Sequence, residues 1–97
     1  MSLDIRVRSV PVIKAEIWLR LERFILMTEL LGCKTDAERA ELIDVSERHM
    51  SRARSRRVGE TVIAKTLVGL GRHEGELRRH QLIPTFEELF EIRERAA

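Results

Sequence analysis

The segment TDAERAELIDVSERHMSRARSR, residues 35–56, sets the architecture expected for this 97-residue chain. Thr35 and Glu38 form a capping box, in which each side chain bonds the other residue's amide at the start of a helix. That helix is expected to end near Ile43, and Ser46 then caps a second helix. Two short helices joined by a tight turn form the geometry in which one helix crosses a DNA backbone and the next enters the major groove.

The second helix of the pair is expected over residues 46–57, and it is basic with few apolar positions. Met50 and Ala53 anchor it, and Val45 in the turn can fill the space between the two helices. The acids that would form i,i+4 ion pairs with its arginines are missing. A basic stripe on one element is typical of nucleic-acid binding, and a solvated charged face is the alternative. The arginines are Arg48, Arg52, Arg54, Arg56 and Arg57, and the only acid is Glu47.

This segment resembles the helix-turn-helix of the phage lambda repressor and Cro class, also called the XRE class. Asp44 departs from the class, which usually has glycine in the turn, but Asp adopts the left-handed region more readily than most residues. Arg39 also departs, because an aliphatic residue is usual there. The segments 59–67 and 86–92 look like those of small actinobacterial and actinophage members. The match itself rests on Thr35, Ala40, Val45, Ser46, Met50 and Ser51.

The resemblance implies which residues would meet double-stranded DNA. Base contacts are implied for Glu47, Arg48 and Arg52, since arginine can bond guanine O6 and N7 and glutamate can accept from cytosine N4. Contacts at the edge of the interface or with phosphates are implied for a larger set, with the distal arginines placed for phosphates. That set is Thr35, Ser46, His49, Ser51, Arg54, Ser55, Arg56 and Arg57.

The function expected from these residues is sequence-specific DNA binding by a transcriptional regulator, most simply a repressor acting as a homodimer. The alternative is a protein-interaction module with the same helix-turn-helix shape, such as an antitoxin or an inhibitor of a regulator. A fold alone does not distinguish the two.

Upstream of this segment, residues 11–31 are expected to form one long helix between Pro11 and Gly32. A broad apolar arc of this helix would face the core. A second, narrower seam of Leu19, Leu26 and Leu30 would lie outside that arc. Burying each leucine is worth about 1.5–3 kcal/mol, so we expect either a second subunit or the chain ends to cover the seam. Residues 3–10 alternate in polarity, which predicts a half-buried strand.

Downstream, residues 59–71 predict a strongly apolar fourth helix that ends at a glycine. The polar region 72–81 fits either a short helix or irregular structure. Thr85 and Glu88 form another capping box. The residues that follow, 90–93, fit either a helix end or a short alternating strand.

The whole chain is expected to be one mainly α domain over residues 1–97, a four- to five-helix bundle around a helix-turn-helix core at about 12–71. The terminal segments, 1–10 and 84–97, would pack against this core or dimerise. A short two-stranded β ribbon can join the N- and C-terminal ends. A hydrophobic content of 43%, 35% charged residues and two prolines fit a packed helical domain, and the net charge of +2 discriminates little.

Several other classes are not expected. No run of about 18 apolar residues is present and the first residues lack an apolar signal region, so we expect no membrane partner. The single cysteine, Cys33, indicates a reducing compartment and hence the cytoplasm. His73 and His80 would lie about 10 Å apart on a helix, too far for one metal ion. Neither Cys33 nor Ser46 has an oriented base, so we expect no enzyme, cofactor or small-molecule ligand.

Overall fold

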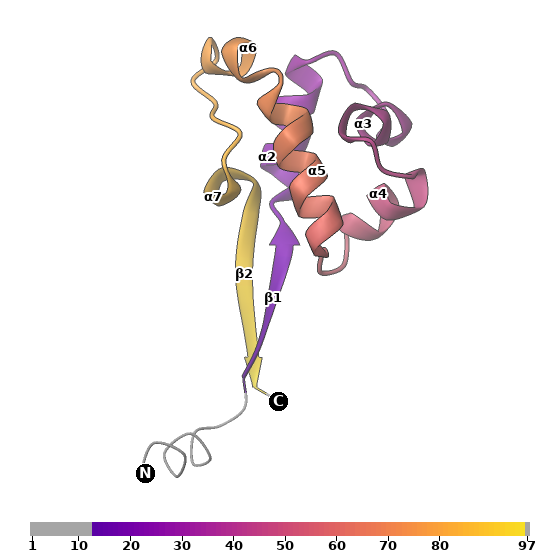
Figure 1. Cartoon of the computed structure of the whole chain (residues 1–97), viewed down its shortest axis with the longest axis vertical. Helices are drawn as coiled ribbons and strands as arrows, with labels where there is room; N and C mark the ends of the chain where they lie inside the picture. Colours follow the sequence, from indigo (N-terminus) through magenta and orange to yellow (C-terminus); the bar gives the residue numbers. More distant parts are fainter. Residues whose placement is uncertain (1–12, 97) are drawn as a thin grey trace.

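The computed structural model describes the backbone of residues 13–96 and the side chains of residues 14–94. Its helices gather at one end, and a two-stranded ribbon extends away from them (Figure 1). This confirms the predicted class, mainly α with a short β ribbon. The elements in chain order are β1 (Ile13–Leu19), α2 (Leu21–Leu30), α3 (Asp36–Ile43), α4 (Glu47–Ala53), α5 (Glu60–Gly71), α6 (Glu74–Arg78), α7 (Phe86–Leu89) and β2 (Phe90–Ala96).

The long helix predicted for residues 11–31 is wrong in its first part. Residues Ile13–Leu19 form β1, which pairs with β2 in antiparallel register from Ile13 opposite Ala96 to Leu19 opposite Phe90. The helix begins only after Arg20, whose amide donates to the Leu89 carbonyl at 2.7 Å. Ile13 and Ile17, four residues apart, fit one face of a helix, but apolar residues also occupy every second position from Ile13 to Leu19, as in a strand. Pairing with the distant strand decides between the two. The strand predicted for residues 3–10 lies outside the described residues.

The ribbon joins the two ends of the described chain, and the ambiguous residues 90–93 belong to its second strand. Leu19 and Phe90, opposite each other at the base of the ribbon, are both buried in the main core. Farther out, Ile17 lies opposite Ile92 and is only partly buried. The ribbon is therefore anchored at one end and carries solvent-exposed apolar surface toward the other.

The predicted leucine seam does not exist as a surface of one helix. Leu19 lies on β1 and is buried in the core, whereas Leu26 and Leu30 lie on α2. Leu26 is 42% exposed, and Leu30 is partly buried against the core. The three residues appeared to share a face only because the helix was extended across residues 13–19.

The core is built from one or two residues of each helix. Phe24 and Met27 of α2, Ile43 of α3, Met50 of α4 and Leu70 of α5 are almost completely buried and belong to one cluster. Each such burial removes apolar surface from water and is worth about 1.5–3 kcal/mol. The shared cluster fixes the two helices of the helix-turn-helix against α2 and α5.

Gly69 allows α5 to pack closely on the end of α3. A Cβ atom at this position would lie 3.0 Å from both the Ile43 Cα and the Leu42 carbonyl oxygen. Those contacts are with backbone, which cannot rotate away, so only glycine permits this helix spacing. The turn that leads into α4 starts directly after this contact.

The predicted helix starts at Thr35 and Thr85 are confirmed by hydrogen bonds. The Glu38 amide donates to Thr35 Oγ1 at 3.2 Å, and the Thr35 amide donates to Glu38 Oε1 at 3.1 Å. The Glu88 amide likewise donates to Thr85 Oγ1 at the start of α7. Residues 74–78 of the ambiguous polar region form the short helix α6. These caps need only nearby residues, which explains why the sequence predicts them.

Cys33 lies between α2 and α3 and is a buried, free thiol. Its amide donates to the Thr28 carbonyl at 2.9 Å, just after Gly32, whose φ of 95° favours glycine. Burial raises the pKa of the Cys33 thiol above its usual value of 9.0, and the nearby carboxylate of Glu38 raises it further. The thiol is therefore a packed, weakly ionised side chain.

Candidate nucleic-acid interface

The turn between α3 and α4 has the backbone that the two-helix arrangement requires. Asp44 adopts the left-handed conformation with a φ of 60°, as expected where the class resembled has glycine. The Val45 amide then donates to the Ala40 carbonyl at 2.9 Å, which closes the turn. Ser46 caps α4 by accepting from the His49 amide at 3.2 Å. The orientation of α4 relative to α3 is thus fixed by hydrogen bonds and by the shared core.

Helix α4 has one buried face and one exposed face. Met50 and Ala53 are its buried residues, as predicted. Glu47, Arg48 and Arg52 are exposed, together with His49 and Ser51. The helix ends at Ala53, so the predicted extent of 46–57 is too long. Arg54, Ser55, Arg56 and Arg57 are exposed in the segment between α4 and α5.

Three of the arginines have no acidic partner within the part of the chain that the structure describes. They come from both turns of α4 and from the segment after it, and all three are exposed. Desolvating such cations against phosphates or base edges breaks no existing ion pair. The three are Arg48, Arg52 and Arg56.

Arg54 differs from these three because it is engaged within the fold. Its guanidinium makes a two-bond contact with Asp36 at the start of α3, with the Nη2 to Oδ1 bond at 2.8 Å. Arg57 lies 3.7 Å from a carboxylate oxygen of Glu16 on β1. The sequence lacks acids at i,i+4 spacing from these arginines, yet Arg54 and Arg57 are paired with acids all the same. Their partners come from other elements, beyond the reach of an i,i+4 rule.

Arg39 is a buried cation that ties α3 to α2. It is 5% exposed, and its Nε donates to Thr28 Oγ1 at 2.8 Å. Its Nη1 donates to Asp36 Oδ1 at 3.1 Å, and Glu29 lies 3.8 Å away. An aliphatic residue, usual here in the class resembled, could make none of these bonds. The departure at this position is therefore accommodated by a polar contact between the two helices.

Asp36 links the two arginines into one network. The hydrogen bond from Arg54 is the main cause that lowers the pKa of this carboxyl, and Arg39 contributes further. Arg54 comes directly after α4, and Asp36 is the first residue of α3. The network therefore holds the end of α4 against the start of α3. Neither the amino-acid composition nor the helical periodicity of the sequence predicts this contact.

The other predicted edge residues are exposed, but several are already used locally. Thr35 Oγ1 is occupied by the capping box of α3. Ser46 Oγ lies 2.9 Å from His49 Nδ1 in addition to capping α4. Ser51 and Ser55 are exposed, on α4 and just after it. Thr35 and Ser46 thus have structural roles that any contact with a phosphate would have to share.

The segment after α4 is also attached to the ribbon. The Val58 amide donates to the Ile17 carbonyl on β1 at 2.8 Å. The ribbon therefore lies beside the end of the α4 region, as the cartoon also shows (Figure 1). No local sequence pattern indicates this contact, because it depends on residues Ile13–Leu19 forming a strand.

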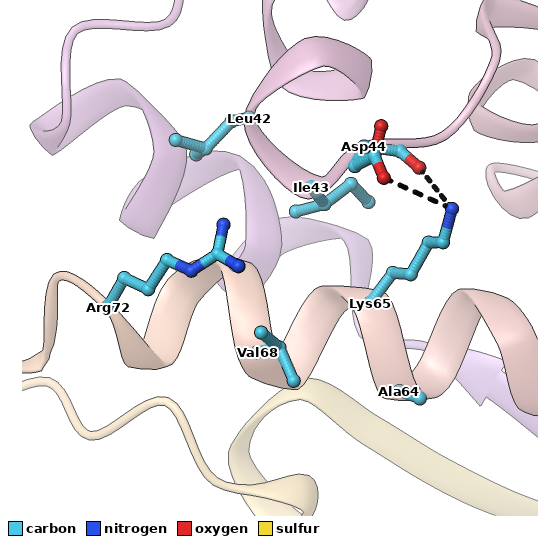
Figure 2. A pocket seen from close by; sticks show the side chains of 8 residues that line it. Leu42, Ile43, Asp44, Ala64, Lys65, Val68 and Arg72 are labelled. Atoms are coloured by element: carbon cyan, nitrogen blue, oxygen red, sulfur yellow. Dashed lines mark hydrogen bonds and ion pairs between the residues drawn. The ribbon is translucent and has the colours of Figure 1, made fainter.

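A groove lies between the end of α3 and the exposed side of α5 (Figure 2). Its volume is about 250 Å³, and Leu42, Val68 and Arg72 line it. Lys65 crosses one end and donates to the Asp44 carbonyl at 2.8 Å. The groove combines apolar surface with cationic side chains, in contrast to the polar face of α4.

Among the described residues, no three His, Cys, Asp or Glu side chains group in a way that could hold a metal ion. No described helix is long and apolar enough to cross a membrane. A scan against protein-family models finds no match for this chain, and searches of curated proteins and of solved structures find none. The resemblance to the XRE class therefore stays a prediction.

Proposed function

We propose that this chain binds double-stranded DNA in a sequence-specific manner and acts as a transcriptional regulator, most simply a repressor. The observation that supports this is the exposed face of α4. It carries Arg48 and Arg52, which have no acidic partner among the described residues, on a helix whose other face is buried and whose start is capped. A rigid helix with unpaired, planar donors on its free face suits the reading of base edges.

The surrounding residues divide by role under this proposal. Glu47, Arg48 and Arg52 would contact bases, because they lie on the exposed face of α4. Arg56 would contact a phosphate, since it is exposed and has no ion pair among the described residues. Arg54 would instead hold α4 in place through Asp36.

The proposal includes a homodimer. A helix with seven residues reaches few base pairs, and two copies related by a two-fold axis double the length of sequence that is read. The protein would then prefer a site made of two inverted half-sites.

Selection of bound duplexes from a random pool tests this function directly. We expect an enriched motif with inverted symmetry and an affinity that falls with salt, because each neutralised phosphate releases counterions. No enrichment, together with no salt-sensitive binding to random duplex, would contradict the proposal.

The second candidate function, a protein-interaction module, is favoured by the groove between α3 and α5. Val68 in this groove is 55% exposed, which is unusual for an apolar side chain, and Arg72 beside it is exposed as well. Val68→Lys would block a protein partner at this groove and leave DNA binding unchanged. If this variant loses activity in cells while it still binds DNA, the groove contacts a protein.

A further inference from the structure

The outer edge of β2 has free backbone groups. The Ile17 carbonyl accepts from Val58 and therefore points away from β2. Ile17 is therefore in a non-hydrogen-bonded pair of the antiparallel ribbon, in which both opposite residues direct their N–H and C=O groups away from each other's strand. Ile92, which lies opposite Ile17, thus presents its amide and carbonyl to the open side of β2. Among the described residues, no backbone group forms a hydrogen bond with the amide or carbonyl of Ile92.

The side chain of Ile92 is exposed as well. It is 63% exposed, more than any other large apolar side chain that the structure describes. An isolated two-stranded ribbon is only marginally stable in water, and an open edge is a template for another strand. Nothing described lies along β2 beyond α7 on its outer side (Figure 1).

The charges beside Ile92 complement those of a second copy. Glu91 precedes this residue and Arg93 follows it, so an antiparallel copy of the segment presents its acid and base in the opposite order. Within one chain these two side chains already form an ion pair at 2.8 Å. A two-fold axis at Ile92 would place this pair beside the oppositely ordered pair of the second copy, with Glu91 opposite Arg93 of the partner subunit on both sides of the axis. Parallel pairing in the same register would place like charges opposite each other, which is unfavourable.

We propose that a second copy of this chain pairs along the outer edge of β2, antiparallel and with Ile92 opposite its own counterpart. The two ribbons would form one four-stranded sheet, in which the exposed isoleucines meet at the centre. This deepens the homodimer of the proposed function by naming its interface, and it replaces the leucine seam. The assembly does not require DNA, so its tests are made without DNA and are independent of DNA binding.

Across the proposed interface, the two copies of Ile92 would form a hydrogen-bonded pair. The Cα atoms of such a pair are about 5.5 Å apart, within the range of about 4.4–6.8 Å that a disulfide spans. Ile92→Cys should therefore cross-link to itself on mild oxidation and give a dimer on a non-reducing gel. Val68→Cys, at a position on α5 that is 55% exposed, is the matched control and should stay monomeric. The native thiol of Cys33 is buried and should not contribute. Equal cross-linking of both variants, or none at Ile92→Cys, would overturn the proposal.

A charge swap tests the register. Glu91→Arg alone and Arg93→Glu alone should each weaken the dimer at least about tenfold, because like charges would face each other twice. The double variant restores opposite charges across the axis and also the Glu91–Arg93 ion pair within each chain, and should regain dimerisation. An equimolar mixture of the two single variants restores opposite charges only across the axis and should regain dimerisation as well. Sedimentation at micromolar concentration measures this, and circular dichroism verifies folding. A wild type that is monomeric there, or a double variant no better than the singles, would refute the interface.

Discussion

The two helices of the helix-turn-helix use their charges in opposite ways. On α3, Asp36, Glu38 and Arg39 all form hydrogen bonds within the protein. On α4, the side chains of Arg48 and Arg52 form none among the described residues and face solvent. Both helices have a capped start and a buried face, so packing alone does not explain the difference. Helix α3 fixes the position of α4, and α4 keeps its cations available to a partner molecule.

The distinction predicts which substitutions change stability and which change binding. A charge on α3 that has buried partners should affect unfolding. A charge on α4 without partners should affect only the interaction with DNA.

The largest effect is expected for Arg39→Ala. This change removes two contacts from α3 to α2 and one within α3, and it leaves Asp36 and Glu29 without their buried cation. We expect a loss of about 2–3 kcal/mol in the free energy of unfolding. The loss is not larger because Asp36 and Glu29 are partly solvated, which reduces the cost of leaving them without a cation. Urea unfolding measures it, with Arg48→Ala as the control on α4. A change in Arg39→Ala as small as that of the control would contradict the role assigned to Arg39.

Next is Arg52→Ala, which should weaken binding to the preferred duplex by about 1–3 kcal/mol, or roughly fivefold to more than hundredfold. Binding to random duplex should fall much less, because that binding depends on phosphates. Stability should be unchanged, since Arg52 is exposed and unpaired within the described chain. Arg79→Ala, an exposed arginine after α6, controls for loss of charge alone. Equal losses on both duplexes would indicate that Arg52 contacts only backbone.

Acid should weaken the contact between α3 and the end of α4. The hydrogen bond from Arg54 holds the pKa of Asp36 below its usual value of 3.8. A carboxyl with a lowered folded-state pKa stabilises the protein fully above its unfolded-state pKa, and this stability is lost as pH falls through the folded-state value. Wild type should therefore lose stability as the pH falls below about 4, and Asp36→Asn should not show this loss. The difference should be at most about 1 kcal/mol, because solvent screens the pair.

The smallest effect separates two neighbouring arginines. Arg56→Ala should flatten the slope of log K against log salt by about 0.9, the value for one lost phosphate contact. Arg54→Ala should leave this slope nearly unchanged, since Arg54 is bonded to Asp36. Binding to random duplex at several salt concentrations provides the comparison. The opposite order would mean that Arg54 exchanges Asp36 for a phosphate on binding.

The features that were predictable from sequence are those decided by nearby residues. The capping box at Thr35, the left-handed Asp44 and the cap at Ser46 each need only a few neighbours. The strand Ile13–Leu19 was missed because its pairing partner begins at Phe90, far along the chain. Its apolar spacing fits both a helix and a strand until that partner is known.

Part of the candidate site was unpredictable for the same physical reason. The exposed face of α4 follows from its own helical spacing, with Met50 and Ala53 inward. The pairing of Arg54 with Asp36 joins the residue after α4 to the start of α3, and the hydrogen-bond partner of Arg39 on α2 is a hydroxyl. Such contacts depend on how the helices pack, which local patterns do not specify.

The buried thiol of Cys33 is a natural probe of local opening in this protein. It lies where α2 leads into α3, and as the only cysteine it is the sole site for thiol-specific reagents. Because the closed state shields the sulfur and disfavours the thiolate, a reagent can react only when this corner opens. The labelling rate of this thiol therefore measures how readily that corner opens in the unmodified protein, without any engineered probe.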